Sequence, residues 1–267
     1  MKANRRCFIV GAGDFFGFLQ PPEAGDYLIA ADGGYRALER LGYRPDLLIG
    51  DFDSLGQVPG DPSEPGEDGP SNMDNGNSFP VFGSREGGPS NMDNGNSFPA
   101  LKPGQDGFGS HIDAGQIIRL PVRKDDTDIG AAVKIGLDKG FRDFRIYGGT
   151  GGRFAHTMAN IQLLSHIAET GARAFLYGKN AVMTALKNGK LSFREGAAGY
   201  ISIFSLADIS RGVSISGLKY ELENGILENT FSLGVSNEFL ACPAHICVEE
   251  GTLLVIWEDD ANRFLAT

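Results

Sequence analysis

Between residues 7 and 177 the chain alternates short apolar runs with helical patterns, and this alternation is the feature that most constrains its fold. The helical patterns cover residues 35–41, 127–139 and 155–170, and a glycine that can end a helix follows each one. The strand-type runs are residues 7–10, 27–31, 47–49, 117–120, 144–147 and 174–177. Alternation at this pitch predicts an α/β fold built on a doubly wound, mostly parallel sheet.

The pattern changes from about residue 190 onward. No stretch of helix length remains, and short alternating runs are separated by turns rich in Gly, Asn and Asp. These runs are residues 191–193, 200–206, 213–215, 219–222, 246–248 and 253–257. We therefore expect a small all-β sandwich over residues 189–267, following an α/β domain over residues 1–188.

Residues 57–115 fit neither pattern, because they are rich in Gly, Pro, Asn, Asp and Ser. Within them the sequence GPSNMDNGNSFP occurs unchanged at 69–80 and again at 88–99. One interpretation is a binding array, and the other is a duplicated, unstructured insertion. The second is favoured, because so few apolar residues can hardly offset the entropy of ordering and two copies are too few for a solenoid. The rest of the fold can tolerate such a loop, since closing a longer loop costs little more.

Charge and composition argue against several classes of partner. The net charge is −10, which repels nucleic acid and anionic membrane surfaces. The apolar run at residues 7–10 is too short for a signal peptide, and no stretch approaches the roughly 20 apolar residues of a membrane helix. The three cysteines are an odd number without metal-ligand spacing. We therefore expect a reduced, cytoplasmic protein.

Acidic residues collect where the predicted strands end. Asp32 follows the second run, and Asp51 and Asp53 follow the third, while Asp125, Asp126 and Asp128 follow the fourth. In an open parallel sheet, ligands bind outside the carboxyl ends of the strands. A single aspartate here is more often a turn residue or a helix cap, and Asp125 or Asp126 could cap the helix that starts near Thr127. Taken together, the carboxylates predict a Mg²⁺ ion that bridges them to substrate phosphates.

A glycine-rich turn, Gly148-Gly149-Thr150-Gly151-Gly152-Arg153, lies between a predicted strand and a predicted helix. Backbone N–H groups can approach phosphate oxygens closely there, and Arg153 adds a planar donor fork. His156 and Asn160 follow one helical turn apart, a pair that is more often structural than functional. Gly11-Ala12-Gly13 only loosely resembles a dinucleotide fingerprint.

Five segments in this order resemble the thiamine pyrophosphokinase family over essentially the whole chain outside the insertion. They are AADGGYRALERLGYRPDLLIGDFDS (30–54), RLPVRKDDTD (119–128), YGGTGGRFAHTMANIQLL (147–164), SGLKYELENGIL (216–227) and VSNE (235–238). The resemblance implies an enzyme that transfers pyrophosphate from ATP to the hydroxyl of thiamine, with Mg²⁺ as cofactor. It also implies a homodimer whose active sites combine the α/β domain of one subunit with the β domain of the other.

The resemblance also assigns residues. Asp32, Asp51, Asp53 and Asp128 match the positions that hold Mg²⁺, and the last three are the catalytic set. The residues that the resemblance assigns to ATP binding are Asp32, Gly33, Lys124, Asp125, Thr127, Gly149, Thr150, Gly151, Gly152, Arg153 and His156. Thiamine binding falls to Tyr220, Ser236 and Asn237.

Three departures from the family pattern stand out: Ala155 replaces the usual Asp before His156, Tyr220 replaces a stacking Trp, and the insertion is longer than the usual connection. Two alternatives to the enzyme remain at this stage. One is a sensor that binds thiamine or a nucleotide without turnover, which Ala155 and the insertion suggest. The other is a nucleotide-dependent oxidoreductase, suggested by Gly11-Ala12-Gly13, although it explains neither the acidic residues nor the β domain.

Overall fold

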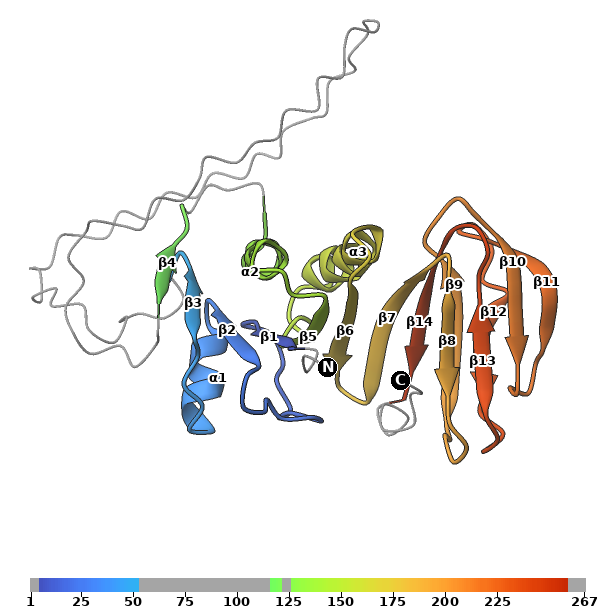
Figure 1. Cartoon of the computed structure of the whole chain (residues 1–267), viewed down its shortest axis with the longest axis horizontal. Coiled ribbons are helices and arrows are strands. Elements are labelled where there is room, and N and C mark those ends of the chain that lie inside the picture. The colour runs from blue at the N-terminus through green and yellow to red at the C-terminus, as the bar shows by residue number, and fades with distance from the viewer. Residues whose placement is uncertain (1–4, 53–115, 122–125, 259–267) are drawn as a thin grey trace, which may run out of the picture. The chain divides into compact units, whose positions relative to one another are not determined.

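The structure is a computed structural model that describes residues 5–52, 116–121 and 126–258, all within one compact unit (Figure 1). The predicted insertion at 57–115 lies outside the described residues, as do Asp53, Lys124 and Asp125. Within the described residues, no helix is both long and apolar enough to cross a membrane.

The predicted parallel sheet is present and is formed by six strands. They are β1 (Cys7–Val10), β2 (Tyr27–Ala31), β3 (Leu47–Gly50), β4 (Ile117–Arg119), β5 (Asp143–Tyr147) and β6 (Arg173–Gly178). Their order is β6-β5-β1-β2-β3-β4, and every neighbouring pair is parallel. The chain runs outward from β1 to β4 on one side and returns to β5 and β6 on the other. The direction of winding therefore reverses between β1 and β5, which is where ligands bind in sheets of this kind.

Three helices connect these strands: α1 (Gly34–Arg40), α2 (Asp128–Asp138) and α3 (Phe154–Glu169). Each lies within one residue of its predicted bounds at either end. Thr127 is the N-cap of α2, and its hydroxyl accepts a hydrogen bond from the N–H of Gly130 at 3.0 Å. The sequence had offered Asp125 or Asp126 as that cap, and for Asp126 this is wrong, because it pairs instead with Lys134.

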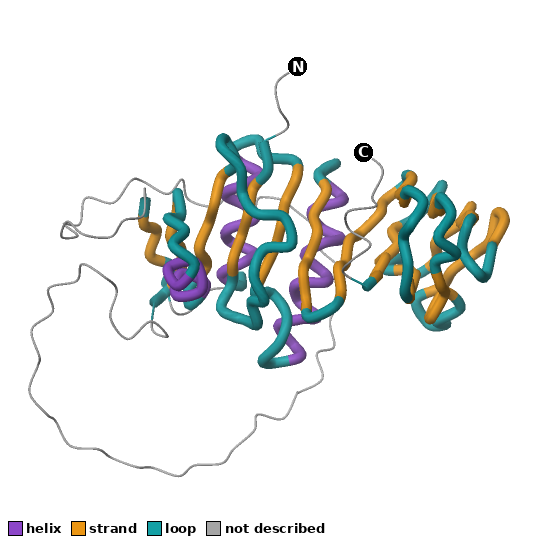
Figure 2. The backbone as a smooth tube through the Cα atoms, turned by 90° about the horizontal axis from the view of Figure 1, so that it is seen from below, coloured by secondary structure: helices purple, strands orange, loops and turns teal. Residues whose placement is uncertain are grey.

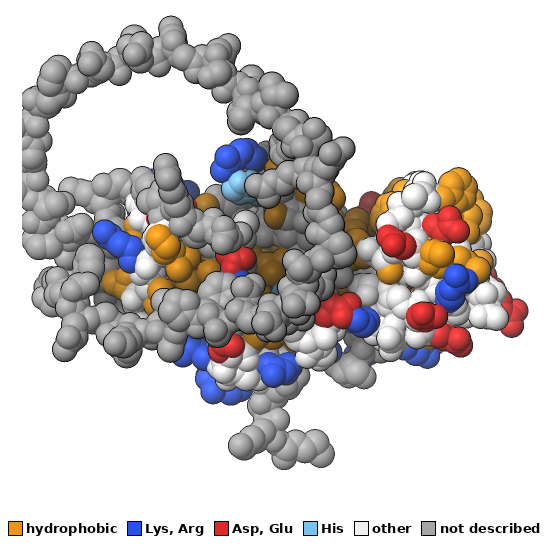
Figure 3. All heavy atoms as spheres, turned by 90° about the horizontal axis from the view of Figure 1, so that it is seen from above, with side chains coloured by type: hydrophobic (Ala, Val, Ile, Leu, Met, Phe, Trp, Pro, Cys, Tyr) orange, Lys and Arg blue, Asp and Glu red, His pale blue; other side chains and the backbone are white. Residues whose placement is uncertain are grey.

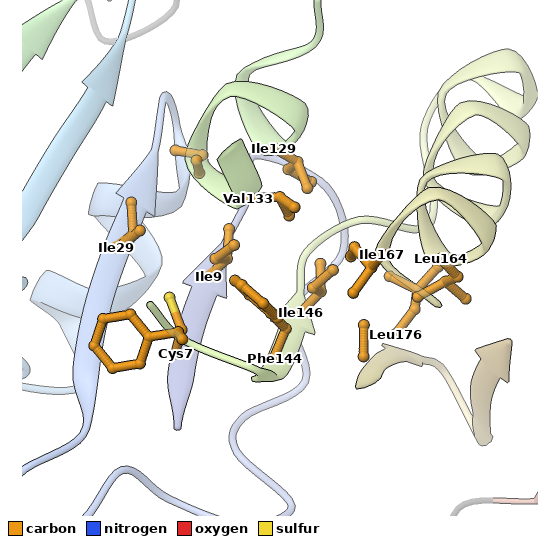
Figure 4. Close-up of a cluster of buried hydrophobic side chains, with 14 of the residues drawn as sticks. Cys7, Ile9, Ile29, Ile129, Val133, Phe144, Ile146, Leu164, Ile167 and Leu176 are labelled. Atoms are coloured by element: carbon orange, nitrogen blue, oxygen red, sulfur yellow. The ribbon is translucent and has the colours of Figure 1, made fainter. Parts of the chain in front are cut away.

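The main hydrophobic core lies between the sheet and the helices α2 and α3 (Figure 4). Alternate strand residues such as Ile9 and Ile146 point to this side, because successive side chains of a strand face opposite ways. Val133 of α2 and Leu164 of α3 meet them, and all four side chains are fully or almost fully buried. On the opposite face, aromatic side chains pack together, with the rings of Tyr147 and Tyr177 stacked 4.2 Å apart.

From residue 181 to residue 258 the described chain is all β, as predicted for residue 189 onward, and this described part contains eight strands. They are β7 (Ala181–Lys187), β8 (Lys190–Phe193), β9 (Tyr200–Ser205), β10 (Ile209–Ser216), β11 (Leu222–Glu228), β12 (Gly234–Glu238), β13 (Ala244–Cys247) and β14 (Thr252–Trp257). Four of them extend the first sheet in the order β6-β7-β14-β9-β12, so that ten strands lie side by side (Figures 1 and 2). The other four form an antiparallel sheet, β11-β10-β13-β8. Trp257 and Phe193, from different sheets, pack edge to face at 5.3 Å.

The fold class is thus confirmed, whereas some strands differ from the prediction. The run at 219–222 is wrong as a strand, since β11 begins only at Leu222. The strands β7 and β12 were not predicted at all. The sequence of β7, AVMTALK, is rich in residues that favour helices, and it becomes a strand because it pairs with β6 on one side and β14 on the other. The domain boundary at residues 188 and 189 stays a prediction, and the ten-stranded sheet contains strands from both sides of it.

Candidate active site

A cavity of ≈ 690 Å³ opens at the point where the winding of the parallel sheet reverses. This volume is typical of small-molecule sites. The loops that follow β1, β2, β3 and β5 contribute to it, together with the first turns of α2 and α3. Its lining residues are Gly11, Ala12, Gly13, Ala31, Asp32, Asp51, Asp126, Thr127, Asp128, Ile129, Gly148, Gly149, Thr150, Gly151, Gly152, Arg153, His156 and Asn160.

The predicted acidic residues Asp32, Asp51 and Asp128 all line this cavity. The backbone N–H of Asp32 donates to the carbonyl of Ile49 at 2.7 Å, which joins the ends of β2 and β3. Gly50 permits this approach, because a Cβ atom there would lie only 3.0 Å from the Cα atom of Asp32. Packing of two neighbouring strand ends therefore brings Asp32 and Asp51 to the same cavity.

The donor chemistry of these residues fits a hard cation, since carboxylate oxygens are the ligands that Mg²⁺ takes from proteins. Among the described residues, however, no three His, Cys, Asp or Glu side chains are gathered closely enough to form a metal site. Asp53, the fourth predicted ligand, lies outside the described residues. The structure thus brings three of the four predicted ligands to one cavity, which Asp126 also lines, without defining a coordination geometry.

The glycine-rich turn forms another part of the cavity wall and is tied to the loop after β1. The N–H of Gly13 donates to the carbonyl of Gly148 at 2.8 Å, and the N–H of Asp14 donates to that of Thr150 at 2.9 Å. A Cβ atom at Gly13 would lie 2.4 Å from the carbonyl oxygen of Thr150. The glycines of Gly11-Ala12-Gly13 are therefore explained by close packing of two loops, which accounts for the weak likeness to a dinucleotide fingerprint.

Helix α3 begins directly after the turn and contributes Arg153, His156 and Asn160 to the cavity. Arg153 is the N-cap residue, and its side chain makes no capping hydrogen bond. Asn160 is 4% exposed, and its Nδ2 atom donates to the carbonyl of Gly149 at 2.7 Å. Asn160 is not among the site residues predicted from the sequence. The available signal was its position one helical turn after His156.

The other residues predicted to bind ATP divide into three groups. Thr127 lines the cavity, along with every predicted residue of the turn. Gly33 is the N-cap residue of α1 and does not line it. Lys124 and Asp125 lie outside the described residues.

The predicted thiamine-binding residues lie in the all-β part, and none of them lines the cavity. Tyr220 is 61% exposed, whereas Asn237 is 3% exposed. Asn237 bonds through its side chain to both backbone polar groups of Tyr220. Ser236 has a positive φ of 57°, and its N–H donates to the hydroxyl of Ser202 at 3.1 Å. Within one chain, therefore, the structure does not bring these residues to the cavity that the acidic residues line.

Comparison with known proteins identifies relatives of both parts of the chain. A family model described as "Thiamin pyrophosphokinase, catalytic domain" matches residues 111–176. A second, described as "Thiamin pyrophosphokinase, vitamin B1 binding domain", matches residues 190–253. The two models follow one another along the chain in the same order as the α/β and all-β parts.

Two curated proteins are similar in sequence. Thiamine pyrophosphokinase from Bacillus subtilis (strain 168) is 28% identical over 138 residues, which cover 51% of this chain and 64% of the relative. Thiamin pyrophosphokinase 1 from Caenorhabditis elegans is 28% identical over 147 residues, covering 50% and 59%. The similarity thus spans less than two thirds of the length of either relative.

Solved structures share the fold over nearly the whole chain. The thiamine pyrophosphokinase from Bacillus subtilis has a TM-score of 0.66 at 21% identity and covers 96% of this chain and 100% of its own. That from Geobacillus thermodenitrificans has a TM-score of 0.65 at 22% identity, covering 96% and 99%. The yeast thiamin pyrophosphokinase has a TM-score of 0.61 at 13% identity, covering 98% and 89%. At these identities the likeness establishes the fold alone.

Proposed function

Since this chain belongs to the thiamine pyrophosphokinase family, we propose that it transfers a pyrophosphoryl group from ATP to the hydroxyl of thiamine, giving thiamine diphosphate and AMP. One observation carries the proposal: a single cavity at the reversal point of the sheet is lined both by Asp32, Asp51 and Asp128 and by the glycine-rich turn. Backbone N–H groups that can bind phosphate thus line the same cavity as carboxylate oxygens that can bind a cation.

The glycine-rich turn is the proposed binding site for the polyphosphate of ATP. Gly149, Thr150 and Gly151 present backbone near the start of α3, where the helix dipole favours negative charge. Arg153 at the same helix end adds a guanidinium that can bind two phosphate oxygens at once. Thr127 and His156 line the same cavity and complete the described part of the ATP site.

Asp32, Asp51 and Asp128, with Asp53, are the residues proposed to hold Mg²⁺. When bound, the ion would neutralise phosphate charge that increases at the oxygens as the pyrophosphoryl group is transferred. The carboxylates themselves have two further tasks. They repel the polyphosphate in the absence of a cation, and one of them takes the proton of the attacking hydroxyl.

In the proposed transfer, the hydroxyl oxygen of thiamine forms a bond to the β-phosphorus of ATP. The bond from that phosphorus to the oxygen that bridges the α- and β-phosphates breaks, and AMP leaves with this oxygen. The hydroxyl proton passes to a cavity carboxylate. The reaction needs the hydroxyl held in line with the leaving oxygen, so the orientation of thiamine contributes directly to the rate.

Thiamine binding is proposed to fall to Tyr220, Ser236 and Asn237. The exposed ring of Tyr220 offers a π face to a cationic thiazolium. Because these residues do not line the cavity of their own chain, we propose a homodimer in which the all-β part of one subunit completes the cavity of the other. Large apolar side chains at the surface of this part support an interface there, and hydrophobic side chains are visible on it in Figure 3. They include Phe231 (69% exposed), Leu233 (56%), Val235 (48%) and Leu240 (55%).

A cytoplasmic location is proposed together with this activity. The three cysteines form no disulfide: Cys7 is buried, Cys247 is half-buried and Cys242 is exposed. A protein that keeps free thiols fits a reducing compartment.

The test is AMP release by the purified full chain with ATP, Mg²⁺ and thiamine. Formation of AMP and thiamine diphosphate that requires both thiamine and metal supports the proposal. ADP as the product would contradict it, because the γ-phosphorus would then be the one attacked. Thiamine and ATP binding with no product would favour the sensor instead.

A further inference from the structure

Four consecutive carbonyl groups, from Tyr147 at the end of β5 to Thr150 in the glycine-rich turn, are each held by a hydrogen-bond donor. The carbonyls of Tyr147, Gly148 and Thr150 accept from backbone N–H groups of the loop after β1, at 2.8, 2.8 and 2.9 Å. The donors are, in the same order, Gly11, Gly13 and Asp14. The carbonyl of Gly149 is different, because it accepts from the side chain of Asn160 at 2.7 Å.

These bonds determine where the N–H groups of the turn point. The described chain contains no cis peptide bond, and in a trans peptide the C=O and N–H groups point in opposite directions. With its carbonyls held by these donors, the turn directs the N–H groups of Gly149, Thr150 and Gly151 away from them. In the part of the chain that the structure describes, these three N–H groups donate to no acceptor. All three residues line the cavity.

The orientation of the Asn160 amide follows from the same contact. A carbonyl oxygen can only accept, so the Nδ2 atom must face Gly149 and the Oδ1 atom must face elsewhere. The Oδ1 atom is buried and has no donor among the described residues. Gly149 allows the approach, since a Cβ atom there would lie 3.2 Å from Nδ2 and 2.7 Å from the side chain of Leu176.

We propose that Asn160 is a positioning residue for phosphate binding: it holds the Gly149 carbonyl so that the N–H of Thr150 faces the polyphosphate. The inference rests on the proposed function in taking ATP as the ligand. Asn160 is the one side chain among the four donors to the turn. Without it, the peptide between Gly149 and Thr150 can rotate more freely, because Gly149, the residue that precedes this peptide, has few forbidden backbone angles.

The experiment compares Asn160→Leu with the wild-type protein. Leucine has the same number of side-chain heavy atoms and the same branching as asparagine, but it cannot donate a hydrogen bond. The matched control is Gln162→Leu, which removes an exposed amide from the same helix. Calorimetry measures binding of ATP with Mg²⁺, of inorganic tripolyphosphate with Mg²⁺, and of adenosine, all without turnover. We expect Asn160→Leu to weaken the binding of ATP and of tripolyphosphate by about tenfold each, because an oriented hydrogen bond is lost. The affinity for adenosine should be unchanged.

Other outcomes contradict the proposal in distinguishable ways. Weaker adenosine binding with unchanged tripolyphosphate binding would mean that Asn160 contacts the nucleoside. An equal loss of affinity for all three ligands would mean a general collapse of the cavity. Unchanged affinities would mean that Asn160 has no role in phosphate binding. Failure of the wild-type protein to bind ATP and tripolyphosphate would overturn the proposed function together with this inference.

A second variant and a second measurement cover the case in which leucine disturbs folding. Asn160→Ala keeps helix propensity and removes the same donor, so the same ligand pattern is expected. Independently, the amide resonance of Thr150, identified with a Thr150→Ser variant, should shift when tripolyphosphate binds to the wild-type protein. An unshifted Thr150 amide in a protein that binds tripolyphosphate would overturn the proposal.

Discussion

The side-chain amide of Asn237 bonds to both backbone polar groups of Tyr220. Its Oδ1 atom accepts from the N–H of Tyr220 at 2.9 Å, and its Nδ2 atom donates to the carbonyl at 2.7 Å. Asn237 is almost fully buried, while the Tyr220 side chain is exposed. The sequence suggested that both residues contact thiamine, whereas this contact gives Asn237 the additional task of fixing the backbone that carries the aromatic ring.

The first prediction concerns this pair. Replacement Asn237→Leu should raise KM for thiamine by about tenfold, because Tyr220 loses two hydrogen bonds that hold its backbone. The double variant with Tyr220→Ala should be little worse than Tyr220→Ala alone, since residues that act through one contact are not additive. Steady-state kinetics of the four proteins measures this coupling. Additive effects would mean that Asn237 and Tyr220 act independently, and Asn229→Leu is the control for loss of an exposed amide.

The second prediction concerns Asp51. Replacement Asp51→Asn should lower kcat by at least about 100-fold, because it removes a charged ligand from the proposed cation site while keeping the shape of the side chain. The temperature of unfolding should change little, since Asp51 is partly exposed to the cavity. Turnover and thermal unfolding are measured on the same samples. Near-wild-type activity would contradict the assignment of Asp51 to the cation, and Asp208→Asn on the surface is the control.

The third prediction tests the composite active site. Subunits with Asp51→Asn and subunits with Tyr220→Ala are each expected to be nearly inactive. If each site combines two subunits, random mixing restores one intact site in each mixed dimer, or about a quarter of wild-type activity at equal amounts. Activity is measured after the subunits are mixed under conditions that allow exchange. Sedimentation as a monomer, or no recovery after verified exchange, would contradict the dimeric site.

The fourth prediction concerns acid stability and the pair of Arg6 and Asp26. Burial acts to raise the pKa of Asp26, but hydrogen bonds from the Arg6 guanidinium and from the N–H groups of Glu23 and Arg6 outweigh it and lower the pKa. The closest contact of the two side chains is 2.6 Å. A carboxyl group whose pKa is lower in the folded state adds stability above its unfolded pKa, and this stability is lost as the pH falls through the folded pKa.

Replacement Asp26→Asn should therefore lower the free energy of unfolding at pH 7 by about 1–3 kcal/mol and flatten its dependence on pH below about 4. Urea unfolding at several pH values measures both effects. The control is Glu23→Gln, whose exposed carboxylate lies 3.5 Å from the same guanidinium and should matter little. An unchanged pH profile in Asp26→Asn would contradict the role given to the pair.

Features set by neighbours along the chain could be read from the sequence. Apolar spacing and a following glycine placed α2 and α3 to within one residue, because helix periodicity and capping act over a few positions. The positions of Asp32, Asp51 and Asp128 after predicted strands likewise indicated that they lie at one edge of the sheet, because the carboxyl ends of parallel strands lie on the same side. The order of the sheet around β1 then explains why these three residues reach a common cavity.

Only the tertiary structure decided the relationships between distant backbones. Strand β7 has a helix-favouring sequence, and its place between β6 and β14 depends on hydrogen bonds that no local pattern encodes. The contacts of Asn160 with Gly149 and of Asn237 with Tyr220 join residues 11 and 17 positions apart. An asparagine can donate and accept in any direction, so its partner is set by which backbone groups the packing of strands and helices leaves within reach. The sequence by itself therefore determined the helices, most of the strands and the residue types that line the cavity, whereas the assembled fold determined the place of β7 and which backbone groups Asn160 and Asn237 contact.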